Sequence, residues 1–211
     1  MPRLYAASVL ALTAALLGGI GLTILRGAAD RDADRFAGCR QTRVAGGAGN
    51  IGGPFELISE TGETVTDADI ITGPTLIYFG YTFCPDICPL DVARNAVATD
   101  LLEQQGYLVT PVFITIDPAR DGVAEVASFA DSMHPRMIGL TGSLQQVDAA
   151  SNTYRTYVNR RDGGGDPFYL VDHSTFSYLV FPDHGFVEIF SRDTTPEDMA
   201  RRIGCFADAI T

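Results

Sequence analysis

Basic residues are scarce in this sequence. The chain of 211 residues carries 15 Lys and Arg residues against 26 Asp and Glu residues, which gives a formal net charge of −11. A nucleic-acid partner is therefore not expected, because phosphate contacts need clustered Lys and Arg side chains. Charged residues make up only 19% of the chain and hydrophobic residues 46%. This composition excludes a wholly disordered protein and is typical of a globular chain with one membrane segment.

The N-terminal region lacks charge over a long stretch. From Leu4 to Leu25 there is no charged side chain. A membrane-spanning helix needs about 20 such residues, whereas the apolar region of a cleavable signal peptide has about 7–15. We therefore predict one N-terminal transmembrane helix within residues 1–26; the alternative is cleavage after Ala29. Arginines flank both ends of the stretch, so they do not fix its orientation.

The rest of the chain divides by composition. Residues 27–53 are rich in Gly and Ala and predict a linker, and residues 54–211 predict one globular domain. The runs TLIYFGY and LVTPVFITID predict strands buried on both faces. PLDVARNAVATDLLEQQG, DGVAEVASFADSM and SLQQVDAASNTYRTYV predict helices. FYLVDHSTFSYLVFPDHGFVEIFS predicts two antiparallel strands, followed by a helix capped by Thr195. This order predicts an α/β, thioredoxin-like fold with a mixed central sheet.

Two of the four cysteines lie close together, in the stretch YTFCPDICPLD. Cys84 and Cys88 are four residues apart, so at the start of a helix both sulfurs would lie on one face. The positive end of the helix favours thiolate over thiol. Two such thiolates can bind one soft cation or can form a disulfide, and the spacing alone allows both. A metal would need a further ligand, for which imidazole is the usual candidate.

The chain has only three histidines. His134 precedes a proline at a helix end and His184 lies in a turn, so both are expected to be surface or capping residues. His173, in LVDHSTF, lies at the entry to a strand. Thioredoxin-like redox proteins place a proline near this position, against the cysteine pair. His173 is thus either a donor beside the two sulfurs or a half-buried structural residue.

At this point the chain resembles a known family. FGYTFCPDICPLD, FITIDPARDG, MHPRMIGLTGS and YLVDHSTFSYLVFPDHGF are similar to motifs of the Sco/SenC family, the membrane-anchored copper proteins of cytochrome c oxidase assembly. The resemblance implies a copper site made by Cys84, Cys88 and His173. It also implies copper delivery to, or redox preparation of, the dinuclear copper centre of oxidase subunit II. Which role dominates stays open, and the copper donor is not identified.

The ligand chemistry agrees with this resemblance. Two thiolates and one imidazole suit Cu(I) and leave its coordination number low. Zn²⁺ would prefer a fourth ligand, so a structural zinc site is the weaker alternative. Asp86 could place negative charge beside the cation, or could simply favour the helix N-terminus. Asp172 could accept a hydrogen bond from His173 in the second shell, or could merely end a strand.

The remaining cysteines, Cys39 and Cys205, lie outside the shared motifs. We predict a disulfide between them, which would tie the linker to the domain in an oxidising compartment; the alternative is two inert or exposed thiols. Such a bond favours a domain outside the cytoplasm. The N-terminus lacks the Arg-rich character of a mitochondrial presequence. We therefore predict a single-pass protein of the bacterial inner membrane with its domain in the periplasm.

Two classes of function remain. The first is a copper-binding assembly factor that turns nothing over, and the second is a membrane-tethered thiol-disulfide oxidoreductase that uses Cys84 and Cys88. His173 separates them, because a pure oxidoreductase does not need it. A third class, peroxidase chemistry, is suggested only by the pattern of Thr82 and Cys84.

Overall fold

The computed structural model describes residues 35–42, 51–160 and 169–210. The chain divides into two compact units, residues 1–38 and 39–211. The predicted anchor, Leu4 to Leu25, and most of the predicted linker lie outside the described residues. Within the described ranges no helix combines the length and the apolar character that crossing a bilayer would require.

A mixed sheet organises the second unit. In the described part of the chain, seven strands form one sheet in the order β2-β1-β5-β4-β3-β8-β9, and β6 pairs with β7 in a separate ribbon. Strands β3, β4 and β5 are parallel, and the strands at both edges are antiparallel. The strands are β1 (Glu56–Ser59), β2 (Thr64–Thr66), β3 (Thr75–Gly80), β4 (Thr110–Thr115), β5 (Ile138–Thr141), β6 (Val158–Arg160), β7 (Val171–His173), β8 (Ser177–Phe181) and β9 (Gly185–Phe190).

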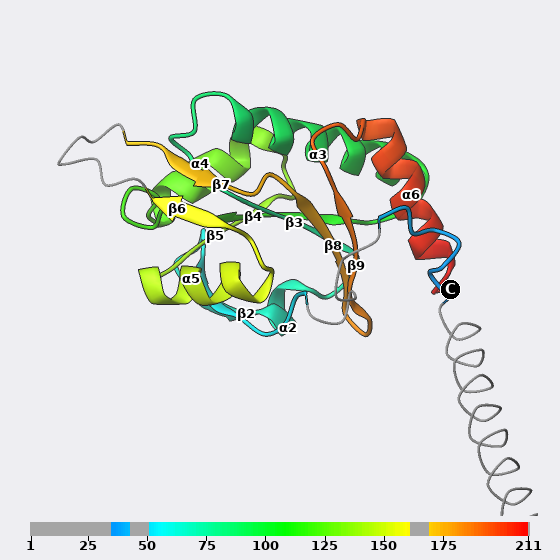
Figure 1. Cartoon of the computed structure of the whole chain (residues 1–211), viewed down its shortest axis with the longest axis horizontal. Coiled ribbons are helices and arrows are strands. Elements are labelled where there is room, and N and C mark those ends of the chain that lie inside the picture. Colours follow the sequence, from blue (N-terminus) through cyan, green and yellow to red (C-terminus); the bar gives the residue numbers. More distant parts are fainter. Residues whose placement is uncertain (1–34, 43–50, 161–168, 211) are drawn as a thin grey trace, which may run out of the picture. The chain divides into compact units, whose positions relative to one another are not determined.

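Helices cover both faces of this sheet. Figure 1 shows α3, α4 and α6 on one face and α2 and α5 on the other. The parallel strands β3, β4 and β5 are connected through α3 and α4, so both crossovers run over the same face. The helices are α2 (Asp67–Ile70), α3 (Ile87–Gln104), α4 (Val123–Met133), α5 (Leu144–Thr153) and α6 (Pro196–Asp208).

The central strands form where the sequence predicts them. All six residues of β3 are buried, and so are five of the six in β4, because helices pack on both faces there. Helix α6 begins after Thr195, whose hydroxyl accepts a hydrogen bond from the backbone N–H of Asp198, with Pro196 in the first turn. The predicted mixed α/β sheet is confirmed.

Two predicted boundaries were wrong. The helix expected to reach Val158 ends at Thr153, because Arg155 adopts a positive φ of 53°. The N–H of Thr156 then bonds the carbonyl of Ser151, which is the six-to-one hydrogen bond of a Schellman motif. Arginine occupies the position that glycine usually marks, so the sequence carries no stop signal there. The segment expected to form two strands forms three, β7, β8 and β9.

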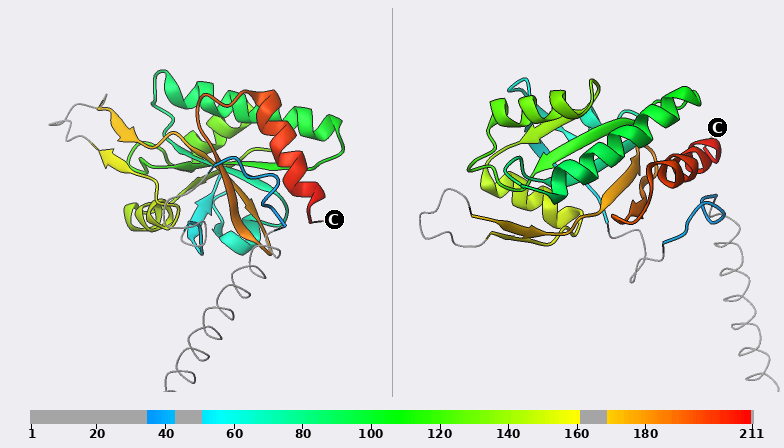
Figure 2. Two further views of the ribbon diagram at one scale, coloured as in Figure 1. Left: turned by 45° about the vertical axis from the view of Figure 1, so that its right-hand side comes forward. Right: turned by 90° about the horizontal axis from the view of Figure 1, so that it is seen from above.

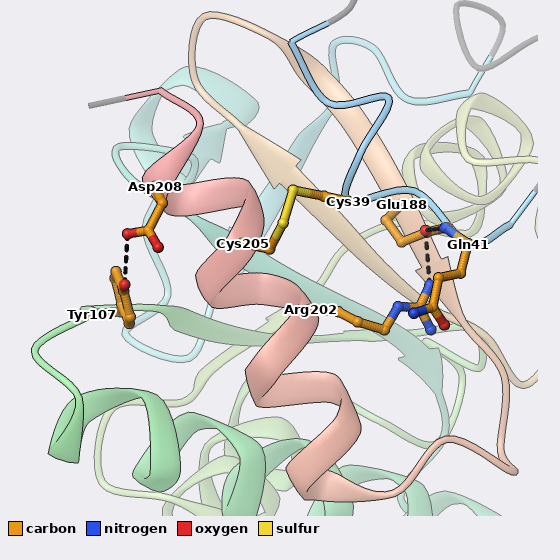
Figure 3. The surroundings of a disulfide bond; sticks show 7 residues. All are labelled: Cys39, Gln41, Tyr107, Glu188, Arg202, Cys205 and Asp208. Atoms are coloured by element: carbon orange, nitrogen blue, oxygen red, sulfur yellow. Dashed lines mark hydrogen bonds and ion pairs between the residues drawn. A yellow bond between two sulfur atoms is a disulfide. The ribbon is translucent and has the colours of Figure 1, made fainter.

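A disulfide joins Cys39 to Cys205 of α6 in this structure, across a sequence separation of 166 residues (Figure 3). Beside it, the buried side chain of Arg202 pairs with Glu188 of β9 at 2.8 Å. The same oxygen of Glu188, Oε2, also accepts a hydrogen bond from the backbone N–H of Gln41, at 3.0 Å. The short segment 39–42 is therefore held against β9 and α6 by one covalent and several polar contacts.

Gly139 provides a test of the packing between α4 and the sheet. A Cβ at Gly139 of β5 would lie 2.6 Å from the carbonyl oxygen of Val126 in α4. We predict that Gly139→Ala lowers the free energy of unfolding by about 1–3 kcal/mol, the usual cost of overpacking. The matched control is Gly73→Ala, where no heavy atom lies within 4 Å. Urea unfolding of both variants checks this, and equal stability of the two would contradict the packing described.

Candidate metal centre

The two sulfurs of the motif lie between β3 and α3. Cys84 is half-buried in the connecting loop, and Cys88 is fully buried in the first turn of α3. The backbone N–H of Cys88 donates to Sγ of Cys84 at 3.3 Å. The helix therefore begins around the Cys84 sulfur, which receives the partial positive charge of the helix N-terminus.

Gly80 makes room for this arrangement at the end of β3. A Cβ at Gly80 would lie 3.2 Å from Sγ of Cys88 and 2.8 Å from the ring of Tyr78. Any larger residue would push the first turn of α3 away from the sheet. The sequence contains this glycine directly after a strand, but its packing role depends on contacts that the sequence alone does not reveal.

His173 reaches the sulfurs from the separate β6–β7 ribbon. Its Nε2 lies 3.4 Å from Sγ of Cys88, and its Nδ1 lies 2.7 Å from the carbonyl oxygen of Ser174. A carbonyl can only accept, so Nδ1 carries a proton, and Nε2 is the ring nitrogen directed at the sulfurs. With Nδ1 engaged in this way, Nε2 is the nitrogen available to bind a metal.

The backbone around Ser174 fixes the direction of this ring. The N–H of Ser174 donates to the carbonyl of Tyr157 at 3.0 Å, and its hydroxyl accepts from the N–H of Tyr157 at 3.1 Å. Tyr78 and Tyr81 approach His173 edge-on, with ring centroids 6.2 and 6.0 Å away. The imidazole is thus held by its hydrogen bond and by two aromatic walls.

The other predicted residues occupy different places. Asp172 pairs with Asn159 across the ribbon and lines the pocket, whereas Nδ1 of His173 donates to the carbonyl of Ser174. Asp86 is the exposed N-cap residue of α3. Its backbone N–H, together with stronger contacts, lowers the pKa of Cys84. Both residues line the pocket beside the sulfurs.

The remaining histidines lie outside the site. His134 is buried at the C-cap of α4, where its Nε2 lies 3.3 Å from Asp100 and its Nδ1 accepts from the N–H of Arg136. The expected capping position is confirmed, but its burial shows that it is no surface residue. His184 lies in the turn between β8 and β9 and does not line the sulfur pocket.

A pocket of about 290 Å³ opens onto Cys84 and His173. Its polar atoms are few, and apolar side chains make most of its walls. The residues that line it are Tyr81, Cys84, Pro85, Asp86, Ile87, Leu170, Val171, Asp172, His173 and Thr175. An incoming ligand can therefore approach the half-exposed sulfur, while the second sulfur stays behind it.

The two thiols have opposite electrostatic character. The hydrogen bond from the Cys88 thiol is the largest cause that lowers the pKa of Cys84, to about 3, with further help from His173 and backbone N–H groups. The same hydrogen bond, together with burial, raises the pKa of Cys88 well above its usual range. The reduced pair at neutral pH is therefore one thiolate and one thiol, which share a single proton.

Within the ranges that the structure describes, no group of three or more Cys, His, Asp and Glu side chains already stands as a metal-holding cluster. The contacts are pairwise, from Cys84 to Cys88 and from Cys88 to His173. The donor set itself, two sulfurs and one imidazole nitrogen, fits a soft cation of low coordination number.

The site and the fold define a class: a thioredoxin-like domain whose cysteine pair, with three residues between, faces an imidazole instead of a proline. The family model described as SCO1/SenC matches residues 43–208. The chain belongs to the SCO1/SenC family.

Relatives agree over most of the chain. Protein SenC of Rhodobacter capsulatus is 51% identical over 203 residues, which cover 96% of this chain and 91% of that protein. The mitochondrial SCO1 homolog of Homo sapiens is 35% identical over 196 residues, which cover 92% of this chain but only 64% of that protein.

Solved structures share the fold. The Arabidopsis thaliana ScoI structure with copper bound is 37% identical with a TM-score of 0.69, covering 75% of this chain and 99% of that one. The yeast Sco1 structure with copper bound is 34% identical with a TM-score of 0.70, covering 75% of this chain and 89% of that one.

The low pKa of Cys84 predicts an unusual alkylation profile. Thiolate is the nucleophile, so a thiol of ordinary pKa slows about 100-fold between about pH 7 and about pH 5. With its pKa near 3, Cys84 stays thiolate over that range. Its rate with iodoacetamide in the reduced, metal-free protein should therefore change less than about twofold.

The variant Cys88→Ala is the control for this experiment. It removes the largest cause of the lowered pKa of Cys84, so the pH at which the rate begins to fall should move upward. Mass spectrometry of the modified peptide assigns the reaction to Cys84. A 100-fold fall for the wild-type protein over that range would show that the thiolate is not stabilised as described.

Proposed function

We propose that this chain binds Cu(I) through Cys84, Cys88 and His173. We further propose that it acts as a non-enzymatic assembly factor, which delivers copper to, or redox-prepares, the dinuclear copper centre of cytochrome c oxidase subunit II. The observation that carries the proposal is the position of His173, whose Nε2 lies 3.4 Å from Sγ of Cys88 with Nδ1 engaged by a carbonyl. Relatives of 34–37% identity whose structures hold copper support it.

Charge balance favours Cu(I) over a divalent cation. The metal-free cysteine pair holds one thiolate and one thiol, and hence one negative charge. Two thiolates with one Cu(I) also carry one negative charge, so the cation replaces the shared proton without changing the charge of a half-buried site. Metal binding must release that proton, because only the deprotonated sulfur is a ligand. A divalent cation would change the charge of the site and would want more ligands.

Unequal exposure of the sulfurs suits transfer. Cys84 faces the pocket, and Cys88 is buried behind it. A cation held by only three donors has room for an incoming sulfur or nitrogen ligand from the pocket side. The incoming ligand can displace Cys84 first, while Cys88 and His173 still hold the cation. Copper can thus pass on by exchange of one ligand at a time.

The same thiol pair supports a second candidate, a thiol-disulfide oxidoreductase. The half-exposed Cys84 thiolate could attack a partner's disulfide, forming a mixed disulfide and releasing one partner thiolate. Cys88 would then give its proton to the released partner thiolate and attack Sγ of Cys84, releasing the second partner thiolate and leaving a Cys84–Cys88 disulfide. The low pKa of Cys84 favours this candidate. A pure oxidoreductase does not need an imidazole as a metal ligand, which makes His173 the discriminating residue.

Removing His173 separates the two candidates. In His173→Ala both thiols remain, so the dithiol should still oxidise to a disulfide. The affinity for Cu(I) should fall at least 10–100-fold, the loss seen even for outer partners of metal ligands. We expect oxidase activity in cells to fall as it does in Cys84→Ser. Competition with a Cu(I) chelator measures the affinity.

The matched control is His184→Ala, the same chemical change in a turn outside the pocket. It should bind Cu(I) like the wild-type protein. Unchanged Cu(I) affinity and unchanged oxidase assembly in His173→Ala would remove this residue from the site. The oxidoreductase would then be the better account.

We also propose that residues 1–26 anchor the protein in a bacterial inner membrane, with residues 27–211 in the periplasm. The disulfide between Cys39 and Cys205 supports this placement, because such bonds persist in oxidising compartments. A reporter enzyme that is active only in the periplasm should work when fused after Thr211, and the protein should fractionate with membranes. Recovery of a soluble chain shortened after Ala29 would contradict the anchor.

A further inference from the structure

We propose that the loop Asp117–Asp121, between β4 and α4, is a clamp that sets the position of His173 relative to the two sulfurs, with Arg120 and Tyr169 as its positioning residues. The inference rests on the proposed copper site. The two halves of that site come from different parts of the chain, the loop after β3 and the β6–β7 ribbon. Figure 2 shows the ribbon extending from the body of the sheet, so something must fix its distance from the sulfurs.

The sulfur side of the clamp is Asp121. Its fully buried carboxylate accepts hydrogen bonds from the backbone N–H of Thr82 at 2.9 Å and from the Thr82 hydroxyl at 2.5 Å. The hydroxyl of Thr115, at the end of β4, adds a third bond at 2.7 Å. Since Thr82 is two residues from Cys84, these bonds attach the start of the sulfur loop to the end of β4.

The imidazole side of the clamp is Asp117, whose carboxylate is also fully buried. One oxygen accepts from the hydroxyl of Tyr169 at 2.6 Å, and the other pairs with Nε of Arg120 at 2.5 Å. The guanidinium carbon of Arg120 in turn lies 3.7 Å from the centroid of the Tyr169 ring. Asp117, Arg120 and Tyr169 therefore contact one another pairwise. Tyr169 is held both by its hydroxyl, which donates to Asp117, and by its ring face, which lies against Arg120.

Arg120 connects this unit to the sulfur loop. Its guanidinium carbon lies 5.5 Å from the ring centroid of Tyr81 and 5.1 Å from that of Phe83, the residues on either side of Thr82. The Tyr81 hydroxyl also accepts from the backbone N–H of Val171, at 3.4 Å. The guanidinium group of Arg120 therefore lies between aromatic rings from both halves of the site.

The second strand of the ribbon is attached in the same region. Nε of Arg160 in β6 donates to the carbonyl of Ile116 at 2.8 Å, next to the clamp loop. Arg160 pairs with Val171 and Val158 pairs with His173 in the ribbon register. Both strands are thus fixed to the end of β4, and a loosened Tyr169 would let the β7 end of the ribbon, with His173, move away from the sulfurs.

The test is Tyr169→Phe, which keeps the ring beneath Arg120 and removes only the hydroxyl bond to Asp117. In the full-length protein we expect the affinity for Cu(I) to fall about tenfold, the lower end of the range for outer partners of metal ligands. In the metal-free protein, amide exchange of Val171 and Ser174 should become faster, while that of β3 stays unchanged. The reduction potential of the Cys84–Cys88 pair should not change, because Asp121 still holds the sulfur loop.

The matched control is Tyr107→Phe, which removes a similar bond from a tyrosine hydroxyl to Asp208, at 2.6 Å on α6 (Figure 3). It should leave Cu(I) affinity and ribbon exchange unchanged. The double variant Tyr169→Phe with His173→Ala should bind Cu(I) like His173→Ala alone, because the clamp acts through the imidazole.

Wild-type affinity in Tyr169→Phe would overturn the clamp, as would an equal tenfold loss when Tyr169→Phe is added to His173→Ala. If His173→Ala itself binds Cu(I) like the wild-type protein, it is the proposed function that fails. The two failures are therefore distinguished by the single variants.

Discussion

One hydrogen bond, between the thiol of Cys88 and the thiolate of Cys84, underlies the chemistry of this protein. It fixes which sulfur is charged, since it lowers the pKa of Cys84 and raises that of Cys88. It also leaves the site with one negative charge and one exchangeable proton. A monovalent soft cation can replace that proton without adding charge to a half-buried pocket. The unequal burial of the sulfurs then gives an entry side at Cys84 and a retained ligand at Cys88.

The fold supplies what this bond requires. Helix α3 begins at the sulfurs and orients its N–H groups toward Cys84, and Gly80 lets Cys88 lie directly on β3. Beneath them, the hydroxyl of Tyr78 donates to the buried carboxylate of Asp91 at 3.1 Å. That carboxylate is flanked by Arg94 and Arg192, at 3.9 and 3.6 Å, so its buried charge is compensated. The imidazole of His173 belongs to the β6–β7 ribbon, outside the seven-stranded sheet, so separate contacts must fix its position.

The parts of this account that could be predicted from the sequence are those with local signals. Continuous apolar runs predict β3 and β4, and the Thr195-Pro196 cap predicts the start of α6. The pairwise approach of Cys88 and His173 could be anticipated from motifs. The end of α5 could not, because Arg155 adopts its positive φ without a glycine to mark it. Nor could the acceptor of His173, since a backbone carbonyl leaves no trace in residue identity. The partnership of Asp117 with Tyr169 spans 52 residues and exists only after the chain has folded.

X-ray absorption at the copper edge, on the full-length protein loaded with Cu(I), tests the central claim most directly. The account predicts three-coordinate copper with two sulfur ligands and one nitrogen ligand, and it predicts that the nitrogen disappears in His173→Ala. Loading the protein with Cu(I) should also release a proton, because the Cys88 thiol must be deprotonated to bind the metal. A shell of sulfur alone in the wild-type protein, unchanged by His173→Ala, would contradict it.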